Sequence, residues 1–354
     1  MHTFRKIGIL TSGGDAPGMN AAIRAVTRAA LSDGVEVMGI YRGYSGLIDG
    51  DIHPLGLRDV SNILNHGGTM LYSDRCPEFK TEEGMQKAIA TCKKLGIDGI
   101  VAIGGDGTFR GATDLSRRGI PCIGIPGTID NDITSTDETI GFDTAMNTVV
   151  EMVDRLRDTC ESHARCNVVE VMGRNAGDIT LQSAIATGAT AAVIPECPFD
   201  KEQLFEKIRR SKALGKRNFI VIVCEGMGSD FAPELATEIE KATGVETKFA
   251  RLAHVVRGGI PTLRDRVFAT KAGEAAVDAL FAGKSNLVVC TRNGKIVFTD
   301  IQYALTLDNL HKGKIKAEDI QGFSQEDVKE MQRISKMRMD ELADLYLTLN
   351  RVSL

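Results

Sequence analysis

KIGILTSGGDAPGMNAAIRAVTRAALSDGVEVMGIY, residues 6–41, places two short apolar runs on either side of a longer amphipathic stretch. After Lys6 and Glu36 at their first positions, the two runs, at 6–10 and 36–41, are continuously apolar and do not alternate with polar residues. The segment at 21–34 has its apolar residues at helical spacing. This pattern predicts a strand, a helix and a second strand in a parallel sheet that is covered on both faces.

The same alternation continues along the chain. In the first half, a helical segment at 83–96 precedes a strand-like run at 99–105. The second half repeats the pattern, so we expect two α/β units, in agreement with the 354-residue length and usual domain sizes. The strands expected in the second half are NVVEVMG at 167–173, AAVIPE at 191–196, NFIVIVCEG at 218–226 and NLVVC at 286–290. Helices are expected there at 201–216 and 234–244.

The carboxyl-terminal segment has a different pattern. From Ser324 it opens with a capping residue and early acids, which predicts one more helix. We expect this helix to pack on the body of the protein or on a neighbouring subunit, and we see no chemistry in it. Apolar residues recur at near-helical spacing: Val328, Met331, Ile334, Leu342, Leu345 and Leu349.

Composition narrows the class of protein. Apolar residues make up 43% of the chain and charged residues 25%, as expected for a soluble globular protein. The formal net charge of -4 gives no broad cationic field for nucleic acid. The eight cysteines show no metal-ligand spacing, so we expect reduced core thiols. No stretch approaches the roughly 20 apolar residues of a membrane span, so we expect a cytoplasmic protein without membrane contact.

Three glycine-rich loops follow strand candidates, where doubly wound α/β proteins bind their ligands. In the first, Gly13 and Gly14 would let the backbone approach a ligand, and the following helix would offer N–H groups to phosphate. The loop is neither a Walker A loop nor a GxGxxG motif. A turn that needs glycine only for its backbone conformation is an equally good interpretation.

The second loop, VAIGGDGTFRGA, surrounds Asp106 with Gly104, Gly105 and Gly107, and Thr108 follows. An aspartate at a strand end can hold Mg²⁺ on nucleotide phosphates, because magnesium prefers one or two carboxylates plus phosphate oxygens. The alternative is an Asx turn in which Asp106 bonds only its own backbone. The combination of strand, glycines and aspartate favours the metal site.

The third loop, CIGIPGTIDNDITSTDETIGFD at 122–143, holds Asp130 and Asp132 after an apolar run. Asp130 at a strand end could act as general base on a sugar hydroxyl. Asp132 could orient the base or a metal, although helix capping or a solvated loop explains it nearly as well.

Cationic residues near the later strands suggest a phosphorylated substrate. Arg165 and Arg174 flank NVVEVMG, and His254 and Arg257 lie in LAHVVRGG. The planar guanidinium of arginine suits phosphate. Any one of these arginines could instead form a surface salt bridge, and His254 alone is more typical of a structural histidine.

In this order, the motifs resemble the ATP-dependent 6-phosphofructokinases of the bacterial-type phosphofructokinase family. The resemblance extends from Ile9 to Gly259 and as a set it is highly specific. The shared stretches are ILTSGGDAPGMNAAIR (9–24), GGDGT (104–108), PGTIDND (126–132), TIGFDTA (139–145), DRLRDT (154–159), VVEVMGR (168–174) and HVVRGG (254–259).

The resemblance implies a fold and a reaction. The fold would be two Rossmann-like three-layer α/β domains with parallel-rich sheets. Residues 1–140 with about 257–307 would bind ATP, and residues 141–256 with about 308–354 would bind sugar phosphate. The reaction would be transfer of the γ-phosphoryl group of ATP to the 1-hydroxyl of fructose 6-phosphate in glycolysis, with Mg²⁺. The family is usually a homotetramer.

The resemblance also assigns site residues by matched position. Asp130 would be the proton acceptor, and Arg75, Thr128, Asp132 and Arg174 would complete the catalytic group. Asp106 would bind Mg²⁺. The residues expected at ATP are Gly13, Gly14, Tyr44, Arg75, Cys76, Gly105, Asp106, Gly107 and Thr108. Those expected at fructose 6-phosphate are Thr128, Ile129, Asp130, Met172, Gly173, Arg174, Glu225, His254 and Arg257, with Arg165 and Lys248 supplied by the neighbouring subunit.

Several positions depart from the bacterial pattern. Lys248 replaces the family's cross-subunit arginine, which keeps the charge but loses bidentate geometry. Cys76 stands where the pattern has an aromatic residue, which puts adenine packing there in doubt. At the effector site, Thr190 and Leu214 replace a glutamate and a lysine, so we expect altered or lost effector control. The effector residues that remain are Arg24, Arg28, Arg157, Gly188 and Lys216.

Other functions carry weaker support. Pyrophosphate-dependent relatives are expected to have Asp in place of Gly107 and Lys in place of Gly127, so the two glycines favour ATP. NAD and lipid kinases share the GGDGT loop but lack PGTIDND. A non-catalytic regulatory subunit would be expected to lose the base or the metal ligand, whereas Asp130 and Asp106 are both present.

Overall fold

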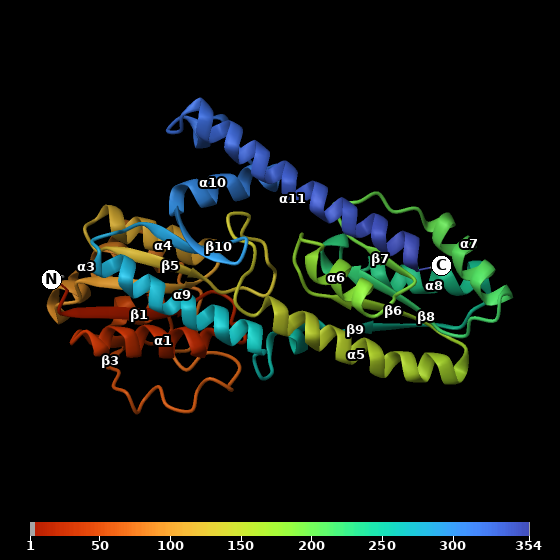
Figure 1. The fold of residues 1–354 in the computed structure, drawn as a ribbon, viewed down its shortest axis with the longest axis horizontal. Helices are drawn as coiled ribbons and strands as arrows, with labels where there is room; N and C mark the ends of the chain where they lie inside the picture. Colours follow the sequence, from red (N-terminus) through yellow and green to blue (C-terminus); the bar gives the residue numbers. More distant parts are fainter. Residues whose placement is uncertain (1–3, 354) are drawn as a thin grey trace. The chain divides into compact units, whose positions relative to one another are not determined.

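The computed structural model describes residues 4–353 (Figure 1). These residues form two compact units. Unit 1 contains residues 4–129, 133–143 and 257–335, and unit 2 contains residues 130–132, 144–256 and 336–353. The segment 308–335, which the sequence analysis grouped with the second domain, therefore lies in unit 1. Its Met331 and Ile334 pack against Leu307 there.

Unit 1 is built on a seven-stranded sheet of order β11-β10-β5-β4-β1-β2-β3. The five strands from β10 to β2 are parallel, and the edge strands β11 and β3 are antiparallel to their neighbours. The strands are β1 (Lys6–Ser12), β2 (Glu36–Ile40), β3 (Ile52–Pro54), β4 (Gly99–Gly104), β5 (Cys122–Pro126), β10 (Leu287–Arg292) and β11 (Lys295–Asp300).

Helices cover both faces of this sheet (Figure 1). Four helices share one apolar core with the strands: α2 (Tyr44–Asp49), α3 (Glu82–Leu95), α4 (Asp106–Arg117) and α10 (Ile301–His311). The remaining two pack against each other and against the strands: α1 (Met19–Ser32) and α9 (Leu263–Phe281). The strands predicted from residues 6–41 read as apolar runs because helices bury both of their faces.

Unit 2 has a four-stranded parallel sheet of order β7-β8-β6-β9. Its strands are β6 (Cys166–Val171), β7 (Ala191–Val193), β8 (Phe219–Cys224) and β9 (Thr247–Arg251). Helices α7 (Lys201–Ala213) and α8 (Phe231–Thr243) close one apolar core, and α6 (Asp178–Ala186) packs against β7 and β8. The predicted mixed α/β fold with parallel-rich sheets is confirmed in both units.

Two long helices carry the chain between the units. These are α5 (Phe142–His163) and α11 (Gln325–Val352). The latter is the helix predicted from Ser324 onward. All eight cysteines are free and six of them are buried, as expected for core thiols. None of the described helices is both long and apolar enough to cross a membrane.

Candidate active site

The first glycine loop follows β1 in unit 1. Gly13 has a φ of 88°, in the left-handed region that glycine adopts without strain. A side chain at Gly14 would collide with Arg257, whose Nη1 would lie 2.8 Å from its Cβ. The Arg257 guanidinium also donates to the carbonyl oxygen of Asp15 at 3.3 Å. Because Gly14 has no side chain, Arg257 can lie against the backbone of this turn, where its guanidinium supplies positive charge for an anion.

The second loop places Asp106 in the first turn of α4. Its Oδ2 lies 3.4 Å from the Nζ of Lys312, and its Oδ1 is buried without a hydrogen-bond donor among the described residues. Asp308 lies close by on α10 and is 1% exposed. Its Oδ1 accepts a 2.6 Å hydrogen bond from the Thr134 amide. Burial, and then the charge of Asp106, raise the pKa of Asp308 well above its ordinary value.

These carboxylates are suited to a divalent cation that phosphate oxygens also bind. The described residues contain no group of three or more His, Cys, Asp or Glu side chains that could hold a metal alone. Magnesium sites on nucleotides need only one or two protein carboxylates, because phosphate and water complete the coordination. The buried, unsatisfied Oδ1 of Asp106 fits such an ion.

The other residues expected at the nucleotide differ in exposure. Tyr44 is buried: its hydroxyl donates to the Thr108 carbonyl at 2.6 Å, and its ring stacks on Phe79 with 4.1 Å between centroids. Thr108 in turn donates through Oγ1 to the Ser12 carbonyl at 2.9 Å. Arg75 is exposed, and Cys76 packs at the edge of the unit 1 core. The structure therefore places Tyr44 beneath the loop and gives it a supporting position.

The acidic residues of the third loop, Asp130 and Asp132, belong to unit 2. Asp130 has no exposed surface, and its Oδ2 forms a 3.1 Å ion pair with the Nε of Arg174. The same guanidinium lies 3.9 Å from Asp132. Asn131 between them has a φ of 51°, so the backbone turns sharply and both carboxylates approach one arginine. A buried carboxylate at the end of such a loop can serve as a general base.

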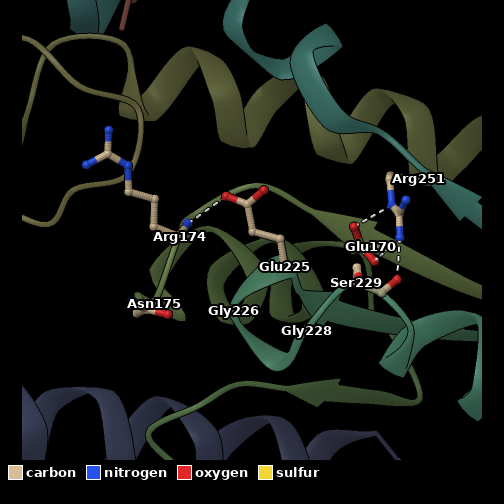
Figure 2. A pocket seen from close by; sticks show the side chains of 8 residues that line it. All are labelled: Glu170, Arg174, Asn175, Glu225, Gly226, Gly228, Ser229 and Arg251. Atoms are coloured by element: carbon tan, nitrogen blue, oxygen red, sulfur yellow. Dashed lines mark hydrogen bonds and ion pairs between the residues drawn. The ribbon is translucent and has the colours of Figure 1, made fainter. Parts of the chain in front are cut away.

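Arg174 is held in turn by Glu225, which opens a short helical turn after β8. The Oε1 of Glu225 accepts hydrogen bonds from the amides of Gly173 at 3.2 Å and Arg174 at 2.8 Å. Gly226 is required here, because a Cβ would come within 2.3 Å of the Arg174 carbonyl. Arg174 and Glu225 line a cavity of about 440 Å³ (Figure 2).

A pair of half-buried acids, Asp178 and Glu196, lies near this loop. The pKa of Asp178 is raised to about 6, mainly by burial and then by the charge of Glu196, and a hydrogen bond from Asn131 opposes the rise. Burial also raises the pKa of Glu196, whose Oε1 accepts a 2.8 Å hydrogen bond from Gly177. The positive charge of Arg338 on α11 lowers the pKa of Asp178 and so opposes the effect of burial. Asp178 therefore connects the loop of Asp130 to α11.

The residues expected to reach a neighbouring subunit share one acid. Arg165 and Lys248 both contact Glu246, at 2.7 and 2.9 Å. The hydrogen bond from Arg165, followed by that from Lys248, lowers the pKa of Glu246 to about 2. His254 is exposed in the same unit, and Met172 is buried at the end of β6.

The expected effector residues divide between the units. Arg24 and Arg28 lie on α1 of unit 1, and the others lie in unit 2. Arg157 donates to Asn218 at 2.9 Å and to the Thr187 carbonyl, just before Gly188. Burial and the nearby charge of Arg157 lower the pKa of Lys216. Thr190 is buried, and Leu214 is 81% exposed.

Comparisons with known proteins identify the family. The family described as phosphofructokinase matches residues 6–280. The chain therefore belongs to the phosphofructokinase family. It is 53% identical over 298 residues to an ATP-dependent 6-phosphofructokinase of Bacillus licheniformis, which covers 84% of this chain and 93% of that protein. A Bacillus pumilus protein of the same name is 50% identical over 323 residues, and the match covers 91% of this chain and 99% of that protein.

A solved phosphofructokinase structure extends the similarity to the whole chain. The Pichia pastoris enzyme in the T-state superposes with a TM-score of 0.86 at 35% identity. The match covers 100% of this chain and 40% of the longer Pichia chain.

Sequence reasoning missed several charged residues of this chain. Asp308 lies in α10 and Lys312 directly follows that helix, both beyond the last matching motif, and no local signal marks them. Glu170 is part of VVEVMGR but was not singled out, and its partner Arg251 lies in a strand too polar to be recognised. An acid inside an apolar strand was the available signal, because a buried carboxylate needs a cationic or hydrogen-bonding partner.

Proposed function

We propose that this chain transfers the γ-phosphoryl group of ATP to the 1-hydroxyl of D-fructose 6-phosphate, which gives fructose 1,6-bisphosphate and ADP in glycolysis. The observation that carries the proposal is the fully buried carboxylate of Asp130 and its 3.1 Å ion pair with Arg174, on a loop whose sequence matches the family. The relatives named ATP-dependent 6-phosphofructokinase support it. A cytoplasmic location fits this activity.

Asp130 acts as the general base. The 1-hydroxyl oxygen attacks the γ-phosphorus, and Asp130 takes the hydroxyl proton as the bond from that phosphorus to the bridging oxygen breaks. ADP leaves with the electron pair of the broken bond. Arg174 moves its charge from Asp130 and Asp132 towards the transferring group, and Thr128 and Ile129 position the loop. Catalysis then depends mainly on placement and charge stabilisation.

The nucleotide binds to the glycine loops of unit 1. The backbones at Gly13, Gly14 and Gly105 approach the phosphates, and Arg75 donates to them. Thr108 supports the loop through its hydrogen bond to the Ser12 carbonyl. Mg²⁺, when bound at Asp106, supplies positive charge for the phosphate oxygens. A side chain at Gly107 would meet no protein atom within 4 Å. The space there is therefore available to an ATP phosphate.

The sugar phosphate binds to unit 2. Met172, Gly173, Arg174, Glu225 and His254 hold it. We propose that Arg165 and Lys248 complete the site of a neighbouring subunit in a homotetramer. Effector control through Arg157, Gly188 and Lys216, with Arg24 and Arg28, is weak, because Thr190 is buried and Leu214 offers no charge.

The deciding experiment measures steady-state rates with fructose 6-phosphate and each phosphoryl donor, in the presence of Mg²⁺. We expect turnover with ATP and none with pyrophosphate. Turnover with pyrophosphate alone would favour the other branch of the family. A lysine in place of Gly127 would require neighbouring side chains to shift, since its Cβ would lie 2.9 Å from the terminal methyl group of Met19 and 3.1 Å from Ile103. Absence of turnover with either donor would contradict the proposal.

A further inference from the structure

Arg251 lines the cavity that holds Arg174 and Glu225, although no motif marks it. It ends β9, directly beside Glu170 of β6 in the register of the parallel pair. Figure 2 shows Arg251 and Glu170 facing each other across these strand ends. We propose that Arg251 is a positioning residue for the sugar phosphate: it fixes the wall of the cavity that carries Glu225 and, through Glu225, the backbone of Arg174. This inference rests on the proposed function.

The Arg251 guanidinium is held at several atoms. Its Nε and Nη2 donate to the two carboxylate oxygens of Glu170 at 2.6 and 3.1 Å. Its Nη2 also donates to the Ser229 carbonyl at 2.6 Å. The Phe249 ring lies beneath it, with 5.4 Å from the ring centroid to Cζ. The Glu170 side chain is 8% exposed and that of Arg251 is 43% exposed, so a buried carboxylate anchors a partly exposed arginine.

The contact to Ser229 connects this anchor to the sugar site. Ser229 follows the short helical turn Glu225–Met227, so Arg251 ties the far end of that turn to β9. At the near end, Glu225 receives the amides of Gly173 and Arg174. Arg174 has a φ of 53°, a backbone conformation that needs support from its surroundings. A turn fixed at both ends therefore holds Arg174 where its side chain meets Asp130.

Lysine cannot replace this arginine. A guanidinium can donate to both oxygens of Glu170 and to Ser229 in one planar arrangement, whereas an ammonium keeps the charge without this fork. Arg251→Lys therefore leaves Glu170 compensated and releases the contact that fixes the turn. Arg209→Lys is a matched control, because Arg209 is equally exposed, at 43%, and also contacts one carboxylate, Glu206, and one carbonyl, that of Ala242, on the surface.

The test compares steady-state kinetics of wild type, Arg251→Lys and Arg209→Lys. Loss of one charge-assisted hydrogen bond predicts a rise of about tenfold in KM for fructose 6-phosphate with Arg251→Lys. We expect KM for ATP to stay within about twofold, as for the control. If the Arg251–Glu170 ion pair were only structural, Arg251→Lys would lower the melting temperature without a selective rise in KM for fructose 6-phosphate. An unchanged KM for the sugar, or an equal rise in both KM values, would overturn the inference.

Calorimetric titration with fructose 6-phosphate separates this inference from the proposed function. Wild type that binds the sugar but does not phosphorylate it would refute the proposed function, and weaker binding by Arg251→Lys would still support the positioning role. Wild type that turns over normally, with equal binding by wild type and Arg251→Lys, would refute the positioning role alone.

Discussion

Asp130 is a charged group with no exposed surface, so the state of its carboxylate depends on its neighbours. Desolvation disfavours the ionised form, and the Arg174 guanidinium at 3.1 Å favours it. The motif PGTIDND was enough to nominate Asp130 from the sequence. The ion pair could not be predicted, because Arg174 lies on another strand end, and only the fold brings the two residues together.

Replacement of Asp130 by serine removes the proposed base and leaves a small polar side chain. We expect kcat to fall about 10²- to 10⁴-fold, the usual contribution of general base catalysis, because the base acts mainly in the transition state. KM for fructose 6-phosphate should change little. The measurement is steady-state kinetics at saturating ATP, with a melting curve to confirm folding. Near-normal turnover by a folded variant would refute the assignment.

Asp178 should make stability depend on pH. Its pKa is raised to about 6 from an ordinary 3.8, so between these values the folded state holds a proton that the unfolded state has released. Stability from this group is therefore present at low pH and is lost as pH rises through that window. This difference in pKa corresponds to a loss of about 3 kcal/mol in the free energy of unfolding across the window. The charges around it are Glu196 and Arg338, with the Asn131 amide.

Asp178→Asn removes this titration. We expect the variant to gain in melting temperature relative to wild type as pH rises from 4 to 7, because only wild type must then ionise a buried acid. Scanning calorimetry at several pH values gives the difference between the two proteins. A difference that stays constant across the range would show that Asp178 keeps an ordinary pKa.

The strands and helices predicted correctly are those with two buried faces or a strong helical period. The missed strands have physical reasons. The sequence of β9, TKFAR, reads as polar because it forms an edge of the unit 2 sheet and exposes Lys248, Phe249 and Arg251. Strand β11 follows β10 through a tight turn at Asn293 and Gly294, both with positive φ. That Asn-Gly pair was a usable hairpin signal.

Helix α11 lies beyond residues 6–280, which match the family, yet it buries apolar side chains in both units. Met331 and Leu349 have no exposed surface. Leu349→Ala should lower the free energy of unfolding by about 2–5 kcal/mol, as for other buried leucines. Leu347→Ala is the control, because Leu347 is 65% exposed and should change stability by less than about 0.5 kcal/mol. Equal melting temperatures for the two variants would mean that the end of the helix is not packed.

At the scale of the whole molecule, the sequence predicted which residues carry chemistry better than how they are grouped. Motif order assigned the nucleotide residues to unit 1 and most sugar residues to unit 2. It could not show that Arg257 lies against Gly14, since these residues are far apart in the chain. The resemblance ended at Gly259, so Asp308 beside Asp106 was beyond its reach.

A site shared between subunits should allow two inactive variants to restore each other. Asp130→Asn lacks the base, and Arg165→Ala lacks the cation that we propose a subunit gives to its neighbour. In a mixed oligomer, an Arg165→Ala subunit keeps its own Asp130 and receives Arg165 from an Asp130→Asn neighbour, which makes one complete site. Activity after joint unfolding and refolding should therefore exceed the sum of the separately refolded variants. If each chain carries a complete site, the mixture will show only that sum, because Arg165 then serves the chain in which it pairs with Glu246.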